Sequence, residues 1–307
     1  MSRQALLTCL AIGALSSAPL AQSGYVPVRV YDSARGAVTD FEAMLADIAR
    51  ADVVFVGEQH DDRNTHRLEL AVLEGVARRR TDAIVAMEMF ERDVQESFDH
   101  FLMGHTSEDD FLRVGRPWPT YATDYKPLVD FAIASNWPVI ASNVPRYLAT
   151  NVSRGGFDAL SSTSDQERQW FAKQLVCPLD DDYFKRFAEA MGDHPSASGV
   201  DAPNVASARQ SLERFYDAQC LRDETMGESV AVAYAAGTAS GKSPLVIHFN
   251  GAFHSDFGEG AAERARRRLP GKRVIVVSVL PVTDLDAIAP DAKERTRAEY
   301  VVYTVRQ

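Results

Sequence analysis

The sequence feature that most constrains the fold is an apolar run that ends in a glycine and two chemically active side chains. Residues 53–56 (VVFV) lead directly into Gly57-Glu58-Gln59-His60. A continuous β-branched and aromatic run bounded by turn residues is typical of a parallel strand that is buried on both faces. In open α/β sheets, ligands bind beyond the carboxyl ends of such strands. We therefore expect Glu58 and His60 to face a ligand-binding crevice.

The same arrangement returns late in the chain, where residues 245–249 (LVIHF) precede Gly251-Ala252-Phe253-His254. The hydrophobic patterns predict further strands at 83–87, 138–142, 273–279 and 300–305, a hairpin at 26–38, and amphipathic helices between the strands. Short connections that alternate strand and helix imply right-handed crossovers and a parallel sheet. The fold class is therefore α/β, with a mainly parallel, mixed sheet flanked by helices.

Residues 156–243 interrupt this alternation, because they show several helical stretches and no convincing strand. We interpret them as a helical insertion that forms a second lobe or a lid over the crevice. The α/β domain then consists of residues 25–155 and 244–307.

The N-terminus has the pattern of a secretory signal, in which Arg3 precedes an apolar stretch and small residues follow as far as Ala21. The apolar stretch is too short to span a membrane. Residues 1–21 are therefore predicted to be a signal peptide, and the mature protein to be in the periplasm or cell envelope. Lipoprotein anchoring through Cys9 has weak support, because few apolar residues precede it. The net charge of -10 argues against a nucleic-acid partner.

Export changes the interpretation of the remaining cysteines, Cys177 and Cys220. An oxidising compartment and an even cysteine count favour a disulfide between them. Two buried free thiols are the alternative.

Six polar side chains lie at or just past predicted strand ends: Glu58, His60, Glu88, Asn143, Asn250 and His254. Neighbouring strands are about 4.8 Å apart, so these groups can converge on one ligand. The set His60, His254 and Glu88 suits a divalent metal such as Mn, Zn or Fe. A carboxylate of Glu58 or Glu88 would then act as general base on a metal-bound water. The alternative is that each group only pairs with backbone, an arginine or a helix end.

A further histidine and three aromatic residues are predicted to line the same pocket, whereas one histidine is predicted to lie in the core. His66 follows the first motif closely enough to contribute, whereas His248 alternates within its strand and is expected to be a hydrogen-bonded core histidine. The rigid loop from Arg116 to Tyr121 offers Trp118 and Tyr121, with Tyr125 following.

Four blocks of sequence resemble one protein family: VGEQHDD at 56–62, AMEMFER at 86–92, ASNVPR at 141–146 and NGAFH at 250–254. They are similar to the ChaN-like family of the Tiki superfamily, which has paired Gly-x-x-His motifs. The resemblance implies a haem-binding protein of the bacterial cell envelope that takes part in iron uptake. The wider superfamily includes metal-dependent hydrolases, and by that resemblance Glu58, His60, Glu88 and His254 would be the active constellation.

Two functions from different classes follow. In the first, the cofactor is haem, with a tyrosine or histidine as the iron ligand and aromatic walls from Trp118, Tyr121 and Tyr125. In the second, the protein is a metal-dependent peptidase or esterase with a small-molecule or peptide ligand. An outer-membrane receptor and a second copy of the chain are the macromolecular partners to consider.

Overall fold

The computed structural model describes residues 25–192 and 205–307, and the predicted signal peptide lies outside these residues. The strands are β1 Val28–Asp32, β2 Ala37–Thr39, β3 Val53–Glu58, β4 Ala83–Glu91, β5 Val139–Asn143, β6 Leu245–Gly251, β7 Val274–Val282 and β8 Tyr300–Val305. The α-helices are α1 Phe41–Ile48, α2 Arg63–Ala77, α3 Gln95–Leu102, α4 Glu108–Gly115, α5 Tyr121–Asp124, α6 Lys126–Ala134, α7 Arg146–Gly155, α8 Asp182–Gly192, α9 Val205–Ala239 and α10 Gly260–Arg268. The 3₁₀ helices are η1 Arg92–Val94, η2 Phe157–Ser162, η3 Glu167–Gln169, η4 Ala252–His254, η5 Asp256–Gly258 and η6 Glu294–Thr296.

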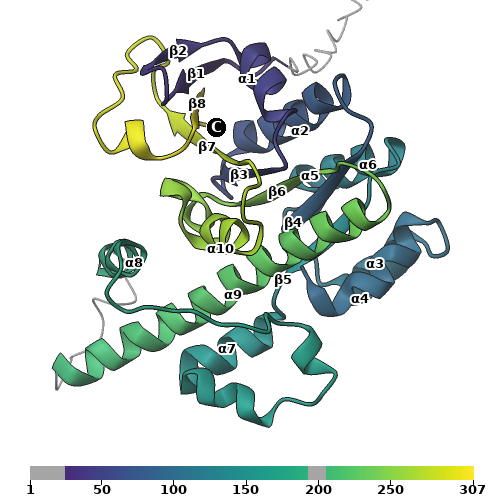
Figure 1. Cartoon of the computed structure of the whole chain (residues 1–307), viewed down its shortest axis with the longest axis vertical. Helices are drawn as coiled ribbons and strands as arrows, with labels where there is room; N and C mark the ends of the chain where they lie inside the picture. The colour runs from purple at the N-terminus through teal and green to yellow at the C-terminus, as the bar shows by residue number, and fades with distance from the viewer. Residues whose placement is uncertain (1–24, 193–204) are drawn as a thin grey trace, which may run out of the picture.

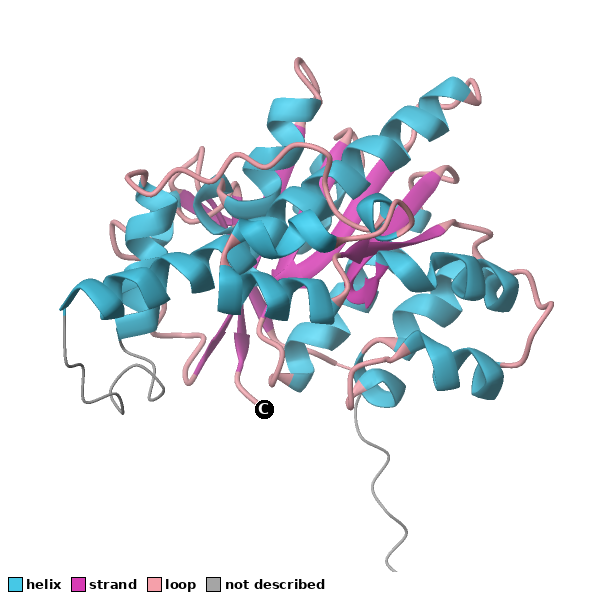
Figure 2. Cartoon of the chain, turned by 90° about the horizontal axis from the view of Figure 1, so that it is seen from below, coloured by secondary structure: helices cyan, strands magenta, loops and turns pink. Residues whose placement is uncertain are grey.

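All of these strands join one sheet in the order β2-β1-β8-β7-β3-β6-β4-β5. The ladders from β8 through β7, β3, β6 and β4 to β5 are parallel, whereas β1 pairs with both β2 and β8 in antiparallel orientation. Helices cover the sheet on both sides (Figures 1 and 2). The predicted α/β fold with a mainly parallel, mixed sheet is therefore confirmed.

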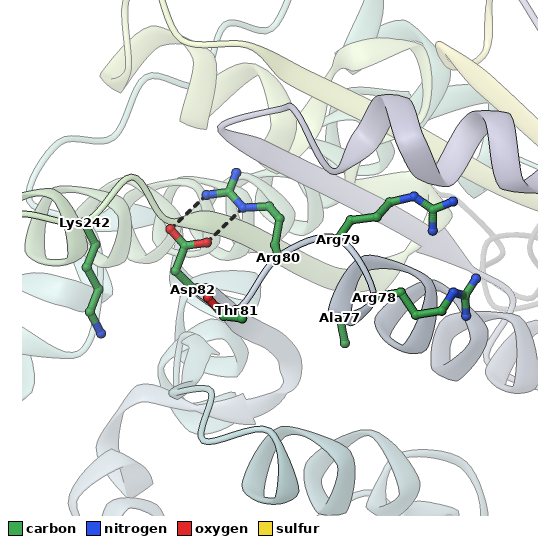
Figure 3. A pocket seen from close by; sticks show the side chains of 7 residues that line it. All are labelled: Ala77, Arg78, Arg79, Arg80, Thr81, Asp82 and Lys242. Atoms are coloured by element: carbon green, nitrogen blue, oxygen red, sulfur yellow. Dashed lines mark hydrogen bonds and ion pairs between the residues drawn. The ribbon is translucent and has the colours of Figure 1, made fainter.

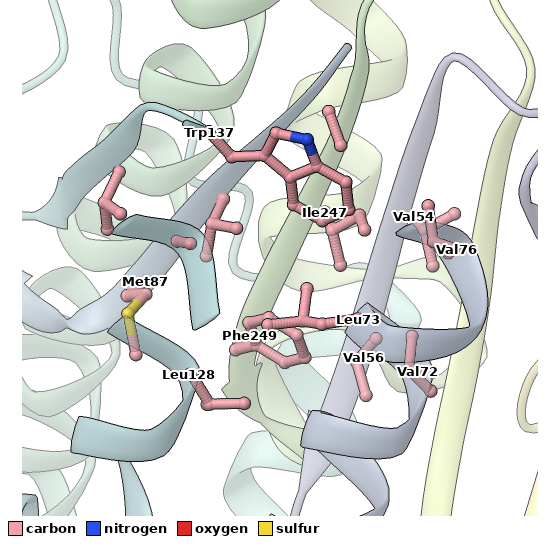
Figure 4. Close-up of a cluster of buried hydrophobic side chains, with 14 of the residues drawn as sticks. Val54, Val56, Val72, Leu73, Val76, Met87, Leu128, Trp137, Ile247 and Phe249 are labelled. Carbon is pink, nitrogen blue, oxygen red and sulfur yellow. The ribbon is translucent and has the colours of Figure 1, made fainter. Parts of the chain in front are cut away.

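The central strands read as continuous apolar runs because each of their faces packs against helices. On one face, Val54 and Val56 of β3 pack with Val72 and Val76 of α2 (Figure 4). On the other face, Phe55 and its neighbours pack against α9 and α10. Successive side chains of one strand thus point into two separate hydrophobic cores, one on each face of the sheet, and the polar side chains lie at the strand ends.

The described part of the segment predicted as a helical insertion contains helices and loops but no strand, and α9 is its main element. The second half of α9 packs on the sheet through Met226 and Val230, while its first half extends beyond the sheet toward α8 (Figure 1). The predicted disulfide between Cys177 and Cys220 is present, with the two Cα atoms 5.9 Å apart, and it joins the loop before α8 to α9. None of the helices that the structure describes is long and apolar enough to cross a bilayer.

Candidate strand-end site

The two Gly-x-x-His motifs begin side by side at the carboxyl ends of adjacent parallel strands. In the register between β3 and β6, Gly57 lies opposite Asn250 and Glu58 lies opposite Gly251. The sheet therefore brings together two segments that are almost two hundred residues apart in sequence. This placement agrees with the expectation that ligands bind beyond the carboxyl ends of the strands.

His254 is held between two carboxylates. Its Nδ1 lies 2.6 Å from Asp223 Oδ1, and its Nε2 lies 3.3 Å from Glu88 Oε1. Glu88 lies near the carboxyl end of β4, and its other oxygen, Oε2, accepts a hydrogen bond of 2.8 Å from the backbone N–H of Gly251. Tyr183 donates a hydrogen bond of 2.6 Å to the second oxygen of Asp223. The imidazole is thus fixed in orientation at both nitrogens.

The charges of this group are strongly coupled. Burial alone would lower the pKa of His254, but the carboxylates of Glu88 and Asp223 raise it to about 10. Burial alone would raise the pKa of Glu88, but the charge and hydrogen bond of His254 lower it to about 2. At neutral pH, His254 is therefore an imidazolium facing the Glu88 carboxylate.

The first motif presents His60 at the surface of the site. The side chain of His60 is 46% exposed, and its Nδ1 contacts Glu58 Oε1. Burial lowers the pKa of His60, but the adjacent Glu58 more than reverses this and raises it. The ring lies over Gly251, where the Cβ of any other residue would be only 2.7 Å from Nε2 and would displace the imidazole. Trp118 packs edge-on against the same imidazole, with ring centroids 4.8 Å apart.

His66 lies behind the first motif, in a closed cluster with Glu58 and Glu69. Its Nδ1 is 3.0 Å from Glu58 Oε2 and 3.0 Å from Glu69 Oε2. Burial opposes the charged imidazole, but the two carboxylates raise the pKa of His66 to about 11. Burial, followed by the charge of Glu58, raises the pKa of Glu69 well above its ordinary value. His66 therefore belongs to the interior and does not line the crevice.

A pocket of about 490 Å³ opens in front of the two motifs. His60, Gly251 and His254 form its floor, and the helical segment supplies an apolar wall through Phe187 and Met191 of α8. Phe253, the residue before the second motif histidine, extends this wall by packing against Tyr183 and Phe187. We call this cavity the strand-end pocket.

The two asparagines at the strand ends support the backbone and do not line the strand-end pocket. Asn143 donates from Nδ2 to the carbonyl of Glu88 at 3.2 Å. Asn250 donates to the carbonyl of Gly251 and to Ser255 Oγ, and its Oδ1 lies 2.9 Å from His248 Nδ1. His248 is fully buried, and burial lowers its pKa to about 4, which confirms it as a hydrogen-bonded core histidine.

The two tyrosines expected to face a ligand lie in the interior instead. Tyr121 packs against Phe90 and donates its hydroxyl to Glu108 at 3.3 Å. Tyr125 is fully buried and donates to Glu58 Oε1 at 2.9 Å, from behind the strand-end pocket. The side chains of Tyr121 and Tyr125 are buried because the short helix α5 starts at Tyr121 and packs this segment onto the core.

Asp223 is a residue of this site that the sequence interpretation missed. It belongs to a stripe on α9 in which Tyr216, Cys220, Val230 and Tyr234 recur at helical spacing and are buried. A carboxylate at an apolar position of such a stripe is unusual, because a buried charge needs a partner. The buried carboxylate was the available signal, but its partner, His254, lies on a different element, η4 after β6.

A second hollow, of about 670 Å³, lies at the opposite end of the strands. It is lined by Ala77, Arg78, Arg79, Arg80, Thr81, Asp82 and Lys242, just before β4 and β6 begin (Figure 3). Arg80 pairs with Asp82, and Arg78 and Arg79 pair with Glu42. The arginines of this hollow pair with carboxylates, and none of the motif residues line it.

Comparison with known proteins supports the family resemblance. The sequence profile of the family described as haem-binding uptake, Tiki superfamily, ChaN matches residues 44–265, which is more than two thirds of the chain. A solved structure described as cofacial heme binding to ChaN of Campylobacter jejuni superposes with a TM-score of 0.65 and 16% identity, covering 90% of this chain and 96% of that one. At this identity the similarity concerns the fold alone.

Two further similarities are more distant. The chain is 22% identical over 241 residues to the Arabidopsis thaliana protein RETICULATA-RELATED 5, chloroplastic, and the match covers 76% of this chain but only 32% of that protein. An erythromycin esterase in its open conformation covers 87% of this chain, with 9% identity and a TM-score of 0.43, which is too low to support an argument.

Proposed function

Since the chain belongs to the ChaN family of haem-binding uptake proteins in the Tiki superfamily, we propose that it binds haem in the cell envelope and takes part in haem-iron uptake. The strand-end pocket is the proposed site, and His60 is the proposed iron ligand. Haem supplies the iron and an apolar ring, and the protein has to supply a donor atom and apolar walls.

The observation that carries this proposal is the position of His60. It is the half-exposed imidazole at the strand-end pocket, and the Glu58 carboxylate already engages its Nδ1. A histidine that contacts a carboxylate through one nitrogen is oriented to use the other for a metal. Phe253 lines the pocket, and Trp118 packs edge-on against the His60 ring, so both supply aromatic surface near the proposed ligand. The residues present therefore fit a haem group.

The tyrosines fit this role less well. A phenolate ligand requires a phenol that can lose its proton. Burial and then the charges of Glu58 and Glu69 raise the pKa of Tyr125, and burial and then Glu108 raise the pKa of Tyr121. Both hydroxyls also donate to carboxylates, which favours the neutral form. These contacts favour His60 over either tyrosine.

The corresponding prediction concerns haemin titration followed by the Soret band. The protein is expected to show a saturable spectral shift, and His60→Ala is expected to weaken binding about tenfold or more, because one coordinate bond worth at least about 1.4 kcal/mol is lost. The double variant His100→Ala/His105→Ala removes two exposed histidines outside the strand-end pocket and controls for adventitious ligation. Absence of a saturable shift would refute haem binding, and an unchanged His60→Ala affinity would refute the assignment of the ligand.

Hydrolysis is the second candidate function, and the Asp223–His254–Glu88 arrangement favours it. A carboxylate that orients a histidine is common in general acid–base sites. However, with a pKa raised to about 10, His254 holds its proton at neutral pH and would act as an acid before it could act as a base. Turnover of an activated ester that disappears in His254→Gln would favour hydrolysis over haem binding.

Export to the envelope is part of the proposal. The signal-like sequence at residues 1–21 supports it, and so does the disulfide between Cys177 and Cys220, since disulfides persist in oxidising compartments. Fractionation of cells, with N-terminal sequencing of the mature chain, tests it. A chain that retains Met1 and stays in the cytosol would contradict export.

A further inference from the structure

The cluster of Glu58, His66 and Glu69 is not accounted for by haem binding. Glu58 ends β3, and His66 and Glu69 lie one turn apart on α2, so their side chains point to the same side of that helix. All three are buried, with exposures of 1%, 4% and 0%. One ligand atom from each lies within 4.8 Å of the others. We call this group the Glu-His-Glu cluster.

The inward-facing atoms of the Glu-His-Glu cluster lack sufficient partners. His66 Nδ1 has a hydrogen bond of 3.0 Å with Glu69 Oε2 and lies 3.0 Å from Glu58 Oε2. Within the described residues, Glu58 Oε2 and Glu69 Oε1 accept no hydrogen bond. Burying a carboxylate oxygen without a partner is costly, and native proteins rarely do so. One imidazole is therefore left between two buried carboxylates.

The outward-facing atoms of the Glu-His-Glu cluster, by contrast, are engaged. His66 Nε2 lies 3.2 Å from the carbonyl oxygen of His60 and 3.7 Å from Asp124 Oδ2. Tyr125 donates a hydrogen bond of 2.9 Å to Glu58 Oε1, which also contacts His60. Metal-binding histidines usually donate their second ring N–H to a carbonyl or carboxylate in this way, and metal-binding carboxylates are similarly supported.

From these contacts we propose that Glu58, His66 and Glu69 bind one divalent first-row transition metal. Two carboxylates balance the charge of a divalent cation, and two oxygen ligands with one imidazole suit Mn²⁺, Fe²⁺ or Zn²⁺. The spacing also fits: ligand atoms about 2.1 Å from an ion and at right angles lie about 3.0 Å apart. That separation matches the two 3.0 Å distances from His66 Nδ1.

This site is separate from the predicted set of His60, Glu88 and His254. His60 and His254 line the strand-end pocket, whereas His66 and Glu69 lie behind it on α2, and Glu58 reaches both the pocket and the Glu-His-Glu cluster. A metal held there would join the end of β3 to the first turns of α2. Because Glu58 also contacts His60, the ion would help to fix the carboxylate that orients the proposed haem ligand.

The test is metal binding by the colourless protein. The chain is stripped with a chelator, then refolded with Mn²⁺ or, separately, Zn²⁺, because the closed cluster limits entry. One equivalent of metal is expected to remain after gel filtration, with a higher Tm than that of the stripped protein. Glu69→Gln is expected to weaken binding at least tenfold, since it replaces a charged ligand by a neutral amide. Glu74→Gln changes an exposed carboxylate on the same helix and should leave binding unchanged.

Three results would overturn the proposal: no retained metal, unchanged metal affinity in Glu69→Gln, or loss of metal in His254→Gln with retention in Glu69→Gln. The last result would assign the ion to the strand-end pocket. If circular dichroism shows that Glu69→Gln does not fold, crystals of the Mn²⁺-loaded unmodified protein decide, because the anomalous density must lie among Glu58, His66 and Glu69. These readouts involve no haem, so the two proposals can fail independently.

Discussion

Asp223→Asn is expected to lower the free energy of unfolding by about 3–5 kcal/mol, because it breaks a buried ion pair and leaves its partner in place. Asp223 is fully buried and makes 2.6 Å contacts with both His254 Nδ1 and the Tyr183 hydroxyl. Asparagine keeps the shape of the side chain but removes its charge. Denaturant unfolding of the two proteins at one pH measures the effect.

The same variant should change how stability depends on pH. The folded pKa of His254 is raised from 6.5 to about 10, so its stabilising contribution is complete below about pH 6.5 and is lost as the pH rises through 10. Glu88 acts in the opposite direction: its folded pKa is lowered from 4.5 to about 2, so its contribution is present above about pH 4.5 and lost as the pH falls through 2. Together these two groups stabilise most between about pH 4.5 and 6.5.

Removing the Asp223 charge takes away one of the two carboxylates that raise the pKa of His254. The decrease in the free energy of unfolding between pH 6.5 and 10 should therefore be shallower in Asp223→Asn than in the unmodified protein. Subtracting the stability profile of the variant from that of the unmodified protein cancels the contribution of His66, which is the same in both. The control is Glu213→Gln on the same helix, which breaks a more exposed pair with Arg209 and should cost less than about 1 kcal/mol. Equal losses in the two variants would show that Asp223 and His254 are not coupled as described.

Gly260→Ala is expected to cost about 2–5 kcal/mol and to displace His254. Gly260 starts α10 with a φ of +54°, and a left-handed conformation costs other residues about 1–2 kcal/mol. A Cβ at this position would also contact the carbonyl oxygen of His254 and lie 2.7 Å from its carbonyl carbon. Overpacking against backbone adds about 1–3 kcal/mol, because backbone atoms cannot move aside as a flexible side chain can.

Gly271→Ala is the matched control for the conformational part of this cost. Gly271 has a φ of +78°, but a Cβ there would meet no heavy atom within 4 Å. Gly271→Ala should lower the free energy of unfolding only by the cost of the left-handed conformation, and it should leave the NMR shifts of the His254 imidazole unchanged. If both glycine variants lose the same stability and neither shifts His254, the close approach of Gly260 has no energetic role.

Local patterns in the sequence were sufficient for the framework of the site. The β-branched runs before Gly57 and Gly251 identify buried parallel strands, and the carboxyl ends of parallel strands meet at one edge of a sheet. The pairing of Glu58 with Gly251 and the contact of His254 with Glu88 follow from that rule. The disulfide was predictable from an even cysteine count after a signal-like N-terminus.

Only the tertiary structure decided which polar groups face the ligand and which are buried. Periodicity indicates that a helix has a buried side, but it does not specify which polar atom on another element that side will meet. Asp223 therefore could not be assigned to His254 until α9 was placed on the sheet, and Tyr125 could not be assigned to Glu58 until α5 turned inward. The partition of the histidines, with His60 at the strand-end pocket and His66 in a closed cluster, arises because long-range packing determines where each imidazole finds its carboxylate.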